Sequence, residues 1–466
     1  MKIMMQVTVI HEDETTTTTI TDFQREQLQA DTLGLTLSEA KDVLKQLQQI
    51  LVSHQINYHN QQHRSCPDCH QMRAKKDSKY LSYRTLFGKI ELESPRYYTC
   101  ACEVREKKSV SPLSQVLTQR SSPELLYLQT KWASLMSYGM TTNLLNDVLP
   151  IDVCDSSVRH QVQTVAQRSE DELGPEQVMF IEGSPHQWEQ LPDPNSRLFV
   201  GIDGGYIHAR EGENRQAGWF EAIVGKSMSE DTASKSFGFV TSYDDKPKRR
   251  VYEMLQSQGF QLNQNITFLS DGGDTVRDLQ HYLSPQSEHI LDWFHITMRI
   301  TVMRNMVKSL PELVEEGLTT EQADRYLESA KWYLWHGNVY LALQKLDDLE
   351  DDLLWFSDVN DPWQKLHQKV EDFITYIKNN EDHIPNYGER YTYNELISTA
   401  FVESAVNQII SKRFVKKQQM RWTKRGAHLL LQMRTKVLDD DLQELFQQWY
   451  PNMEFDNVEI DLDQVA

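Results

Sequence analysis

Two aspartates attract attention because each ends an apolar run and is followed by two glycines. Asp203 ends VGID and Asp271 ends ITFLSD, so each carboxylate is expected at the carboxyl end of a β-strand. Glycine after such a residue lets a substrate approach the backbone closely. Glu403, in a later helical segment, can fold back against the same edge. Three such carboxylates can hold two divalent ions that act on a phosphodiester, and hard oxygen ligands favour Mg²⁺, with Mn²⁺ as the alternative.

The sequence leaves other interpretations of these acids open. An Asp before Gly-Gly, taken singly, is more often a turn former than a metal ligand. Asp292 and His295, in LDWFHI, also fall at an expected strand end. They either support the metal site or form hydrogen bonds in the core.

Cysteines form a second group with recognisable chemistry. Four of the five occur as two close pairs, Cys66 and Cys69 in CPDC and Cys100 and Cys102 in CAC. A strand-rich segment joins the pairs, and two turns that each carry two thiolates are typical of the tetrahedral zinc site of a zinc ribbon. The alternative is four unligated core cysteines. We interpret His70 as a bystander and Cys154 as a small core residue.

Charge is segregated near the end of the chain. Residues 405–436 contain no Asp or Glu and nine basic residues: Lys412, Arg413, Lys416, Lys417, Arg421, Lys424, Arg425, Arg434 and Lys436. Such a strip is expected to contact DNA phosphates. Trp422 and Phe414 can stack on a base, although packing under the helix is the more common role. Residues 437–466 hold nine acidic and no basic residues, and are expected to form a tail that shields the strip.

Composition narrows the class of protein. The chain has 466 residues, 39% of them hydrophobic and 25% charged, which is ordinary for a folded protein. Its formal net charge of −20 excludes coating of nucleic acid by bulk charge but not a local basic groove. No apolar run approaches the length of a membrane span, and the first residues do not resemble a secretory signal. Few, clustered cysteines are typical of a reducing cytoplasm.

Hydrophobic periodicity places these residues on elements. After residue 197 it predicts three strands, a helix, a strand, a helix and a strand, which is the order of an RNase H-like α/β core. Residues 300–395 are expected to be almost wholly helical. Before the core, residues 123–170 predict short helices that resemble a helix-turn-helix, with Arg159 facing DNA, although a plain helical bundle is as common. Residues 37–55 predict a helix that either packs internally or dimerises.

Taken together, these segments resemble a known family. The chain is similar to insertion-sequence transposases of the ISKra type, in the DDE superfamily. The similarity rests on CPDC with YRTLFGKIELESPRYYTCAC, VGIDGG, FLSDGGD, LDWFHI, the WHGN segment and FVESAVNQIISKRFVKKQQMRWTKRGAHLLLQMRT, from about residue 60 to 436. It implies that Asp203, Asp271 and Glu403 are the catalytic triad and that Asn407 shares the face of Glu403. It also implies that residues 300–395 are an insertion within the core.

The resemblance implies a DNA transposase with Mg²⁺-dependent strand cleavage and strand transfer, acting at the nucleoid in a prokaryotic cytoplasm. Its partners would be double-stranded DNA at the element ends and target, in a homodimer or larger assembly. The alternatives are a nuclease without strand transfer and a catalytically lapsed DNA-binding repressor. From first to last, the expected parts are a terminal segment (1–60), a zinc ribbon (61–115), a DNA-binding helical region (120–182), a catalytic core (195–300 and 396–436), a helical insertion (301–395) and the acidic tail (437–466).

Overall fold

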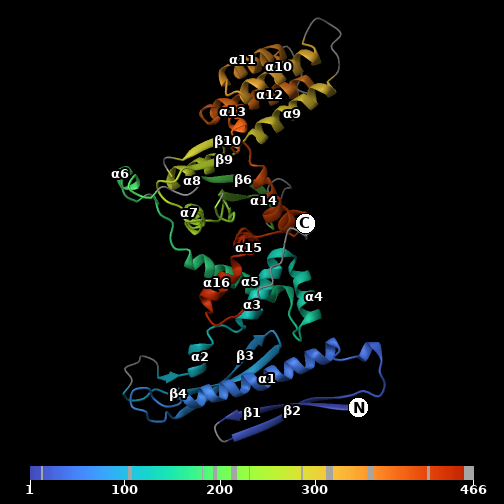
Figure 1. The fold of residues 1–466 in the computed structure, drawn as a ribbon, viewed down its shortest axis with the longest axis vertical. Coiled ribbons are helices and arrows are strands. Elements are labelled where there is room, and N and C mark those ends of the chain that lie inside the picture. Colours follow the sequence, from blue (N-terminus) through green and yellow to red (C-terminus); the bar gives the residue numbers. More distant parts are fainter. Residues whose placement is uncertain are drawn as a thin grey trace. The chain divides into compact units, whose positions relative to one another are not determined.

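The computed structural model divides into two units, Met1–Val165 with Asp440–Ala466, and Ala166–Asp439. It describes the following residues: 1–11, 14–102, 108–180, 182–192, 197–210, 218–229, 231–284, 287–310, 318–354, 362–416 and 420–455. Both units contain helices and strands, so the expectation of a mixed α/β protein is confirmed (Figure 1).

The first unit begins with an antiparallel hairpin and a long helix. Its strands are β1 (Lys2–His11) and β2 (Glu14–Gln24), and a short 3₁₀ turn (Ala30–Thr32) precedes helix α1 (Leu37–Gln62). The helix starts with a capping box, in which Thr36 and Glu39 satisfy each other's backbone N–H groups. The capping box therefore fixes the start of the helix at Leu37, where the sequence predicts it.

The first unit has a second sheet. Its antiparallel strands are β3 (Lys75–Thr85), β4 (Gly88–Tyr98) and β5 (Ser109–Val110), in that order. The paired cysteines lie before β3 and after β4. Ile90 and Leu92 on β4 pack against Ile56 of α1 and Leu113 of α2 (Pro112–Val116). The strand-rich segment expected between the cysteine pairs is therefore a β3–β4 hairpin, and its hydrophobic core lies against α1.

Helices complete the first unit. They are α3 (Pro123–Leu135), α4 (Tyr138–Val148), the start of α5 (Asp155–Glu172) and α16 (Leu442–Trp449). The three helices expected between residues 123 and 170 are thus present. In the first part of the expected acidic tail, Leu442, Leu445 and Phe446 are buried and α16 packs on α3. Residues 456–466 lie outside the described residues.

The second unit contains a five-stranded sheet in the order β10-β9-β6-β7-β8. Its strands are β6 (Leu198–His208), β7 (Trp219–Ser229), β8 (Ser236–Val240), β9 (Ile266–Ser270) and β10 (Glu288–Leu291). β6, β7 and β8 are antiparallel neighbours, whereas β9 and β10 run parallel to β6. The short helix α6 (Pro185–Trp188) precedes the sheet, and α7 (Pro247–Ser257) and α8 (Asp274–Leu283) alternate with its strands as expected.

The sheet has two differently covered faces. One face packs Val200, Ile202 and Phe268 against α7 and α8 residues such as Val251 and Leu279. The other face lies under α14 (Ala400–Val406), which contacts β6 and β7. A π-helix (Asn407–Val415) continues α14, and α15 (Lys424–Leu438) packs along β8.

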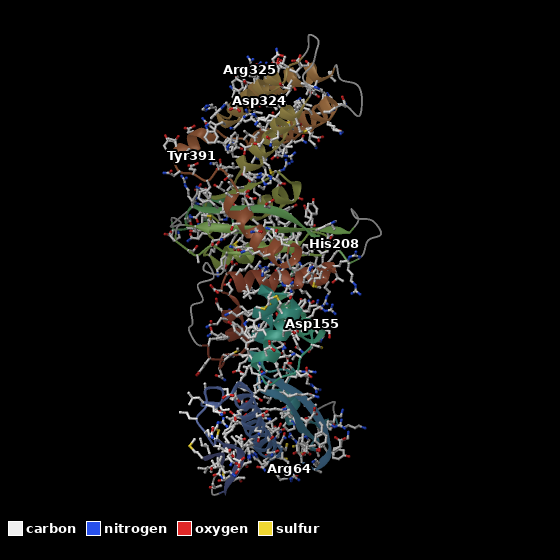
Figure 2. The ribbon with its side chains drawn as sticks, turned by 90° about the vertical axis from the view of Figure 1, so that its right-hand side faces the viewer. Arg64, Asp155, His208, Asp324, Arg325 and Tyr391 are labelled. Atoms are coloured by element: carbon white, nitrogen blue, oxygen red, sulfur yellow. The ribbon has the colours of Figure 1, made fainter. Side chains whose placement is uncertain are left out.

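A helical bundle follows β10, as the sequence predicts for residues 300–395. Its members are α9 (Trp293–Ser309), α10 (Thr320–Trp335), α11 (Val339–Leu353), α12 (Pro362–Asn379), a 3₁₀ turn (Glu381–His383) and α13 (Tyr387–Thr392). Arg304 on α9 forms an ion pair with Asp324 on α10. Figure 2 labels Asp324 and its neighbour Arg325 in this bundle. The bundle core is continuous with Leu269, Ile290 and Leu291 of the sheet.

Candidate functional site

Three aspartates occupy the same level on three parallel strands. Asp271 and Asp292 directly follow β9 and β10, but the expectation that Asp203 ends its strand is wrong, because β6 continues to His208 in its pairing with β7. Gly201 of β6 pairs with Leu269 of β9, and continuing this register by two residues places Asp203 opposite Asp271. Leu291 of β10 pairs with Ser270, which places Asp292 opposite Asp271. Because parallel neighbours lie about 5 Å apart, this register alone brings the three carboxylates to one edge.

The electrostatics of Asp203 reflect this arrangement. Burial raises its pKa first, and the neighbouring carboxylates of Asp271 and Asp292 raise it further. A hydrogen bond from the Gly204 N–H and the nearby His295 ring act in the opposite direction. Close carboxylates that hinder each other's ionisation are a common property of cation sites. Hard oxygen donors of this kind fit Mg²⁺.

Asp292 is the most constrained of the three. It is fully buried, and its oxygens accept hydrogen bonds from the Phe294 N–H at 2.8 Å and from the Thr399 hydroxyl. His295 Nε2 lies 3.6 Å from the same carboxylate. Thr399 immediately precedes α14, and its carbonyl accepts the N–H of Glu403 at 2.9 Å. Asp292 therefore connects the sheet edge to the helix that carries Glu403.

Glycines set how closely α14 lies over β6. A Cβ atom at Gly201 would lie 2.1 Å from Val402 Cγ2, and one at Gly205 would lie 2.8 Å from Ile410 Cδ1. Residues 201, 203 and 205 share one face of the strand, so Asp203 lies on the face that α14 covers. From the sequence, the glycines after Asp203 are expected to let a substrate approach the backbone. In the structure, the second of them, Gly205, instead makes room for the Ile410 side chain.

Glu403 itself is exposed on α14. The ligand atoms of Asp203, Asp271 and Glu403 do not form a cluster within 4.8 Å in the part of the chain that the structure describes. Asn407 lies one turn further, where its side-chain oxygen accepts a hydrogen bond from Lys416 Nζ at 2.6 Å. The structure thus places Asp203, Asp271, Asp292 and His295 at one level of the sheet and leaves Glu403 on the covering helix. Among the described residues, no three of these side chains have ligand atoms within 4.8 Å of one another.

Substituting Gly201 by alanine is expected to displace α14. The new Cβ would overlap Val402 and Phe401, and overpacking of this kind costs about 1–3 kcal/mol. Strand cleavage should fall together with thermal stability. Gly204→Ala is the matched control, because its Cβ would make only an ordinary contact of 3.4 Å with Glu221. Equal melting temperatures for the two variants would contradict the close approach.

The expected basic strip is only partly exposed. Its exposed members among the described residues are Lys412, Lys416, Arg421, Lys424 and Arg425. Lys417 lies outside the described residues. Arg413 is fully buried with its guanidinium 5.2 Å from the Trp422 ring, and Arg434 is buried with its Nε bonded to the Ile409 carbonyl. The expectation that Arg413 and Arg434 belong to an exposed strip is therefore wrong.

Two aromatic residues of the same segment are buried. Phe414 and Trp422 lie with ring centroids 4.8 Å apart, 1% and 3% exposed. Both side chains therefore pack in the core, which is the more common role for such residues and is confirmed here. Arg159, in contrast, is exposed on α5, where it was expected to face DNA.

The four paired cysteines form one cluster in the first unit. Their sulfur atoms all lie within 4.8 Å of one another, with Cys66 Sγ 3.4 Å from Cys102 Sγ and Cys69 Sγ 3.4 Å from Cys100 Sγ. Four sulfurs about 2.3 Å from a zinc ion would be about 3.8 Å apart, so the donor set and spacing fit zinc. A backbone hydrogen bond at Cys69 is the main cause that lowers the pKa of the Cys66 thiol to about 7. His70 is exposed next to this cluster, as a bystander would be.

Cys154 does not have the expected core position. It is exposed immediately before α5, with its sulfur 3.2 Å from the Ser156 hydroxyl. Its carbonyl accepts the N–H groups of Ser157 and Val158 at the start of the helix. The backbone of Cys154 therefore forms the start of α5, and its side chain remains exposed.

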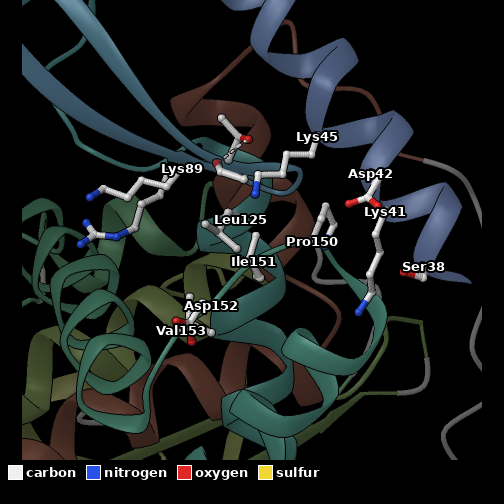
Figure 3. A pocket seen from close by; sticks show the side chains of 13 residues that line it. Ser38, Lys41, Asp42, Lys45, Lys89, Leu125, Pro150, Ile151, Asp152 and Val153 are labelled. Carbon is white, nitrogen blue, oxygen red and sulfur yellow. Dashed lines mark hydrogen bonds between the residues drawn. The ribbon is translucent and has the colours of Figure 1, made fainter. Parts of the chain in front are cut away.

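A cavity of about 480 Å³ lies in the first unit between α1, the β3–β4 turn and the loop before α5. Its charged lining residues are four basic and two acidic: Lys41, Lys45, Arg84, Lys89, Asp42 and Asp152. Figure 3 shows Lys41 and Lys45 projecting from α1 and Lys89 from the hairpin. In a chain of net charge −20, this local excess of cations suits an anionic ligand.

The second unit contains a buried polar cluster that no motif in the sequence predicts. Glu170, Asp244 and His428 place ligand-type atoms within 4.8 Å of one another. The Arg250 guanidinium donates to both oxygens of Glu170 at 2.8 Å and to Asp244 at 2.9 Å. A cation therefore already occupies the space between the carboxylates, and we interpret the cluster as a link between α5, α7 and α15.

Replacing Glu170 by glutamine is expected to destabilise this unit by about 3 kcal/mol at neutral pH, because Arg250 would keep a buried charge with one carboxylate partner fewer. Burial opposes ionisation of Glu170, but hydrogen bonds from His428 and Arg250 outweigh it and lower its pKa to about 2, from 4.5. A lowered pKa stabilises the folded state above pH 4.5, and this stabilisation is lost as the pH falls towards 2.

Urea unfolding between pH 7 and pH 2.5 measures this effect. The difference between the wild type and Glu170→Gln should shrink as the solution becomes acidic. Glu172→Gln, on the last turn of the same helix at an exposed position, is the control. A pH-independent difference would exclude the ion pair as its source.

The class of protein defined so far is a mixed α/β protein with an aspartate-lined sheet edge and a four-cysteine cluster. No protein-family model matches the chain, and no curated protein matches it. Among solved structures, it is similar to the Drosophila P element transposase strand transfer complex, with 9% identity over 70% of this chain and 93% of that one and a TM-score of 0.31.

A crystal structure of NurA is more distant still. It is 11% identical over 55% of this chain and 74% of that one, with a TM-score of 0.10. Both TM-scores are below 0.5, so neither similarity decides the fold or the function. Among the described residues, no helix is both long and apolar enough to cross a membrane.

Proposed function

We propose that the chain is a DNA transposase of the ISKra type, with an RNase H-like catalytic core. The observation that carries the proposal is the common level of Asp203, Asp271 and Asp292 on three parallel strands, with the Glu403 helix packed over that face. Three antiparallel strands extended by two parallel ones also agree with an RNase H-like core. The reaction would be cleavage at the element ends followed by strand transfer.

Asp203, Asp271 and Glu403 would be the catalytic carboxylates that hold Mg²⁺. Bound Mg²⁺ would activate a water or a 3′-hydroxyl and stabilise the leaving oxygen of the phosphodiester. Asp203 and Asp271 have the same position on neighbouring strands, so both can face one phosphate. Glu403 would complete the set from α14, whose distance from the sheet is set by Gly201 and Gly205.

Asp292, His295 and Asn407 would act as positioning residues. Asp292 ties Thr399, and hence the start of α14, to the strand ends. His295 lies beside Asp292 and contributes positive potential at Asp203. Asn407 binds Lys416, one of the exposed cations, so it connects the Glu403 helix to the basic strip.

DNA would be held at several places along the chain. The exposed cations Lys412, Lys416, Arg421, Lys424 and Arg425, together with Lys417, would contact phosphates, because such contacts supply most nonspecific affinity.

In the first unit, the cysteine cluster would hold structural zinc. The α3–α5 region would act as a helix-turn-helix with Arg159 on its last helix, and the basic cavity beside α1 would accept a backbone phosphate.

The test uses a plasmid carrying the DNA that flanks the gene on both sides. Purified protein is incubated with it and Mg²⁺, and nicks and joined products are mapped to the nucleotide. Paired cleavage at inverted ends with strand transfer, lost in Asp271→Asn, is the expected result. Nicks without joined products would replace the proposal with a nuclease. End-specific binding without cleavage by any form would replace it with a DNA-binding repressor.

A further inference from the structure

The cavity of about 480 Å³ in the first unit has walls that hydrogen bonds hold in place. The Asn146 side chain fixes the loop before α5, because it accepts the Val153 N–H at 3.1 Å and donates to the Val153 carbonyl at 3.0 Å. The Asn146 carbonyl accepts a hydrogen bond from Lys41 Nζ on α1 at 2.8 Å. On the hairpin, both the N–H and the carbonyl of Arg84 are bonded to residues 120–122. A ligand would therefore meet a preformed site, which lowers the entropic cost of binding.

The cavity is larger than one phosphate group requires. Pockets of about 300–1,000 Å³ are typical of sites for whole small molecules. Three elements meet beside it at Gly88, where a Cβ atom would lie 3.3 Å from Lys45 Cγ and 3.8 Å from the Pro150 carbonyl oxygen. Leu125 and Val153 add buried apolar surface to the lining, with exposed fractions of 1% and 8%. Such surface gives inorganic phosphate no favourable contact but suits the flat face of a nucleobase.

Charges of both signs line the cavity without neutralising one another. Among the described residues, the Lys45 and Arg84 side chains form no hydrogen bond or ion pair. Within the same part of the chain, this is also true of the carboxylates of Asp42 and Asp152. A ligand that satisfies all four groups must therefore present acceptors and donors together. Phosphate oxygens accept from Lys and Arg, and the N–H groups of a base donate to carboxylates, as the cytosine amino group does.

The position of the cavity favours DNA as the source of such a nucleotide. Residues 150–153 line it and lead, after Cys154, directly into α5, which carries the exposed Arg159. The proposed function places α5 on DNA, so a strand bound there is available to the cavity at the start of the helix. In a duplex, the donors of a base are bonded to the partner strand and its ring faces are stacked. Only an unpaired nucleotide offers a phosphate, a free ring face and free N–H groups at once.

We propose, resting on that function, that the cavity binds one unpaired nucleotide at a DNA end. Lys45 and Arg84 bind its phosphate. Its base lies against Leu125 and Ile151, and its N–H groups donate to Asp152. Figure 3 shows Leu125 and Ile151 between Lys45 and Asp152, as this arrangement requires. The chain thereby distinguishes an open DNA end from a closed duplex.

The experiment measures binding of the full-length protein by fluorescence anisotropy in the absence of Mg²⁺. The three probes are a blunt DNA duplex, the same duplex with a single-stranded extension of three cytidines, and the same extension with abasic sites in place of the bases. The cytidine extension should bind about tenfold more tightly than either other probe, because it alone fills both the charged and the apolar part of the cavity. Free dCMP lacks the contacts of the duplex and should displace this probe only at far higher concentration than unlabelled extended DNA.

Lys45→Ala combined with Asp152→Asn should abolish this preference. The affinity for the blunt duplex should stay within about twofold, because the two changes leave the net charge unchanged. Both positions are exposed, so the fold should be kept. The matched control makes the same two changes at exposed positions of the same unit outside the cavity, as Lys79→Ala with Asp147→Asn, and should keep the preference.

Equal affinity for the cytidine and abasic extensions would reduce the cavity to a phosphate site and overturn the proposal. A blunt duplex that binds as tightly as the extended one, a cavity variant that keeps the preference, or a control that loses it would overturn it too. Displacement by dCMP as effective as by extended DNA would identify a free nucleotide as the ligand instead. Strand transfer without a cytidine preference would contradict only this proposal, and a cytidine preference without strand transfer would contradict only the proposed transposase.

Discussion

Glu403→Gln is expected to lower Mg²⁺-dependent strand cleavage by about a thousandfold, equivalent to about 4 kcal/mol in the transition state, without changing the melting temperature. Glu403 is exposed on α14, and its carboxylate forms no hydrogen bond or ion pair with any described residue. Its loss therefore removes no contact that stabilises the fold. Any effect on cleavage must then come from the reaction itself.

Asp292→Asn is the informative comparison for that variant. Asp292 is fully buried and accepts two hydrogen bonds, so its substitution should reduce both cleavage and stability. Glu371→Gln, at another exposed position on α12, is the control and should change neither quantity. If Glu403→Gln cleaves normally while Asp292→Asn is inactive at a temperature where it remains folded, Asp292 is the third catalytic carboxylate and the assignment of Glu403 is wrong.

The order of elements could be predicted from the sequence because each strand and helix of the second unit has its own hydrophobic period. Asp271 could be placed at a strand end for the same reason, since it follows a continuous apolar run, whereas β6 continues for five residues beyond Asp203. Asp203 and Asp271 lie at the same level because of the register between β6 and β9. This register is set by pairing between residues that are 68 positions apart in the sequence. Local patterns contain no information about such pairing.

Other features were missed because they depend on distant partners. Thr399 binds Asp292 across 107 residues, and Glu170 meets His428 across 258 residues. Arg413 was expected on the surface because its neighbours in sequence are basic, but it lies in a π-helix next to the exposed Lys412. The π-helix changes the angle between successive residues, so a 3.6-residue period does not predict which side chains of this segment are buried.

Removing zinc is expected to unfold the ends of the β3–β4 hairpin and to leave its centre intact. The cysteine cluster joins residues 66–69 to residues 100–102, whereas the centre of the hairpin has its own core of Ile90, Leu92 and Ile56. Binding of a structural zinc contributes about 10 kcal/mol or more to the folding of small zinc modules. In this hairpin, zinc binding is expected to stabilise only the ends near the cysteines, which the hydrophobic core around Ile90 and Leu92 does not include.

Cys66→Ser combined with Cys69→Ser should therefore lose one equivalent of zinc and become sensitive to proteases near residues 64–75, while Cys154→Ser behaves like the wild type. Zinc content by elemental analysis and mapping of the proteolytic fragments measure both effects. Cys154 is exposed and lies outside the cluster, so it controls for the loss of a reactive thiol. A wild type that is purified without metal and shows the same fragments with and without added zinc would exclude a zinc-stabilised module. Cleavage throughout β3 and β4 in the double variant would instead show that the core beside α1 cannot maintain the hairpin alone.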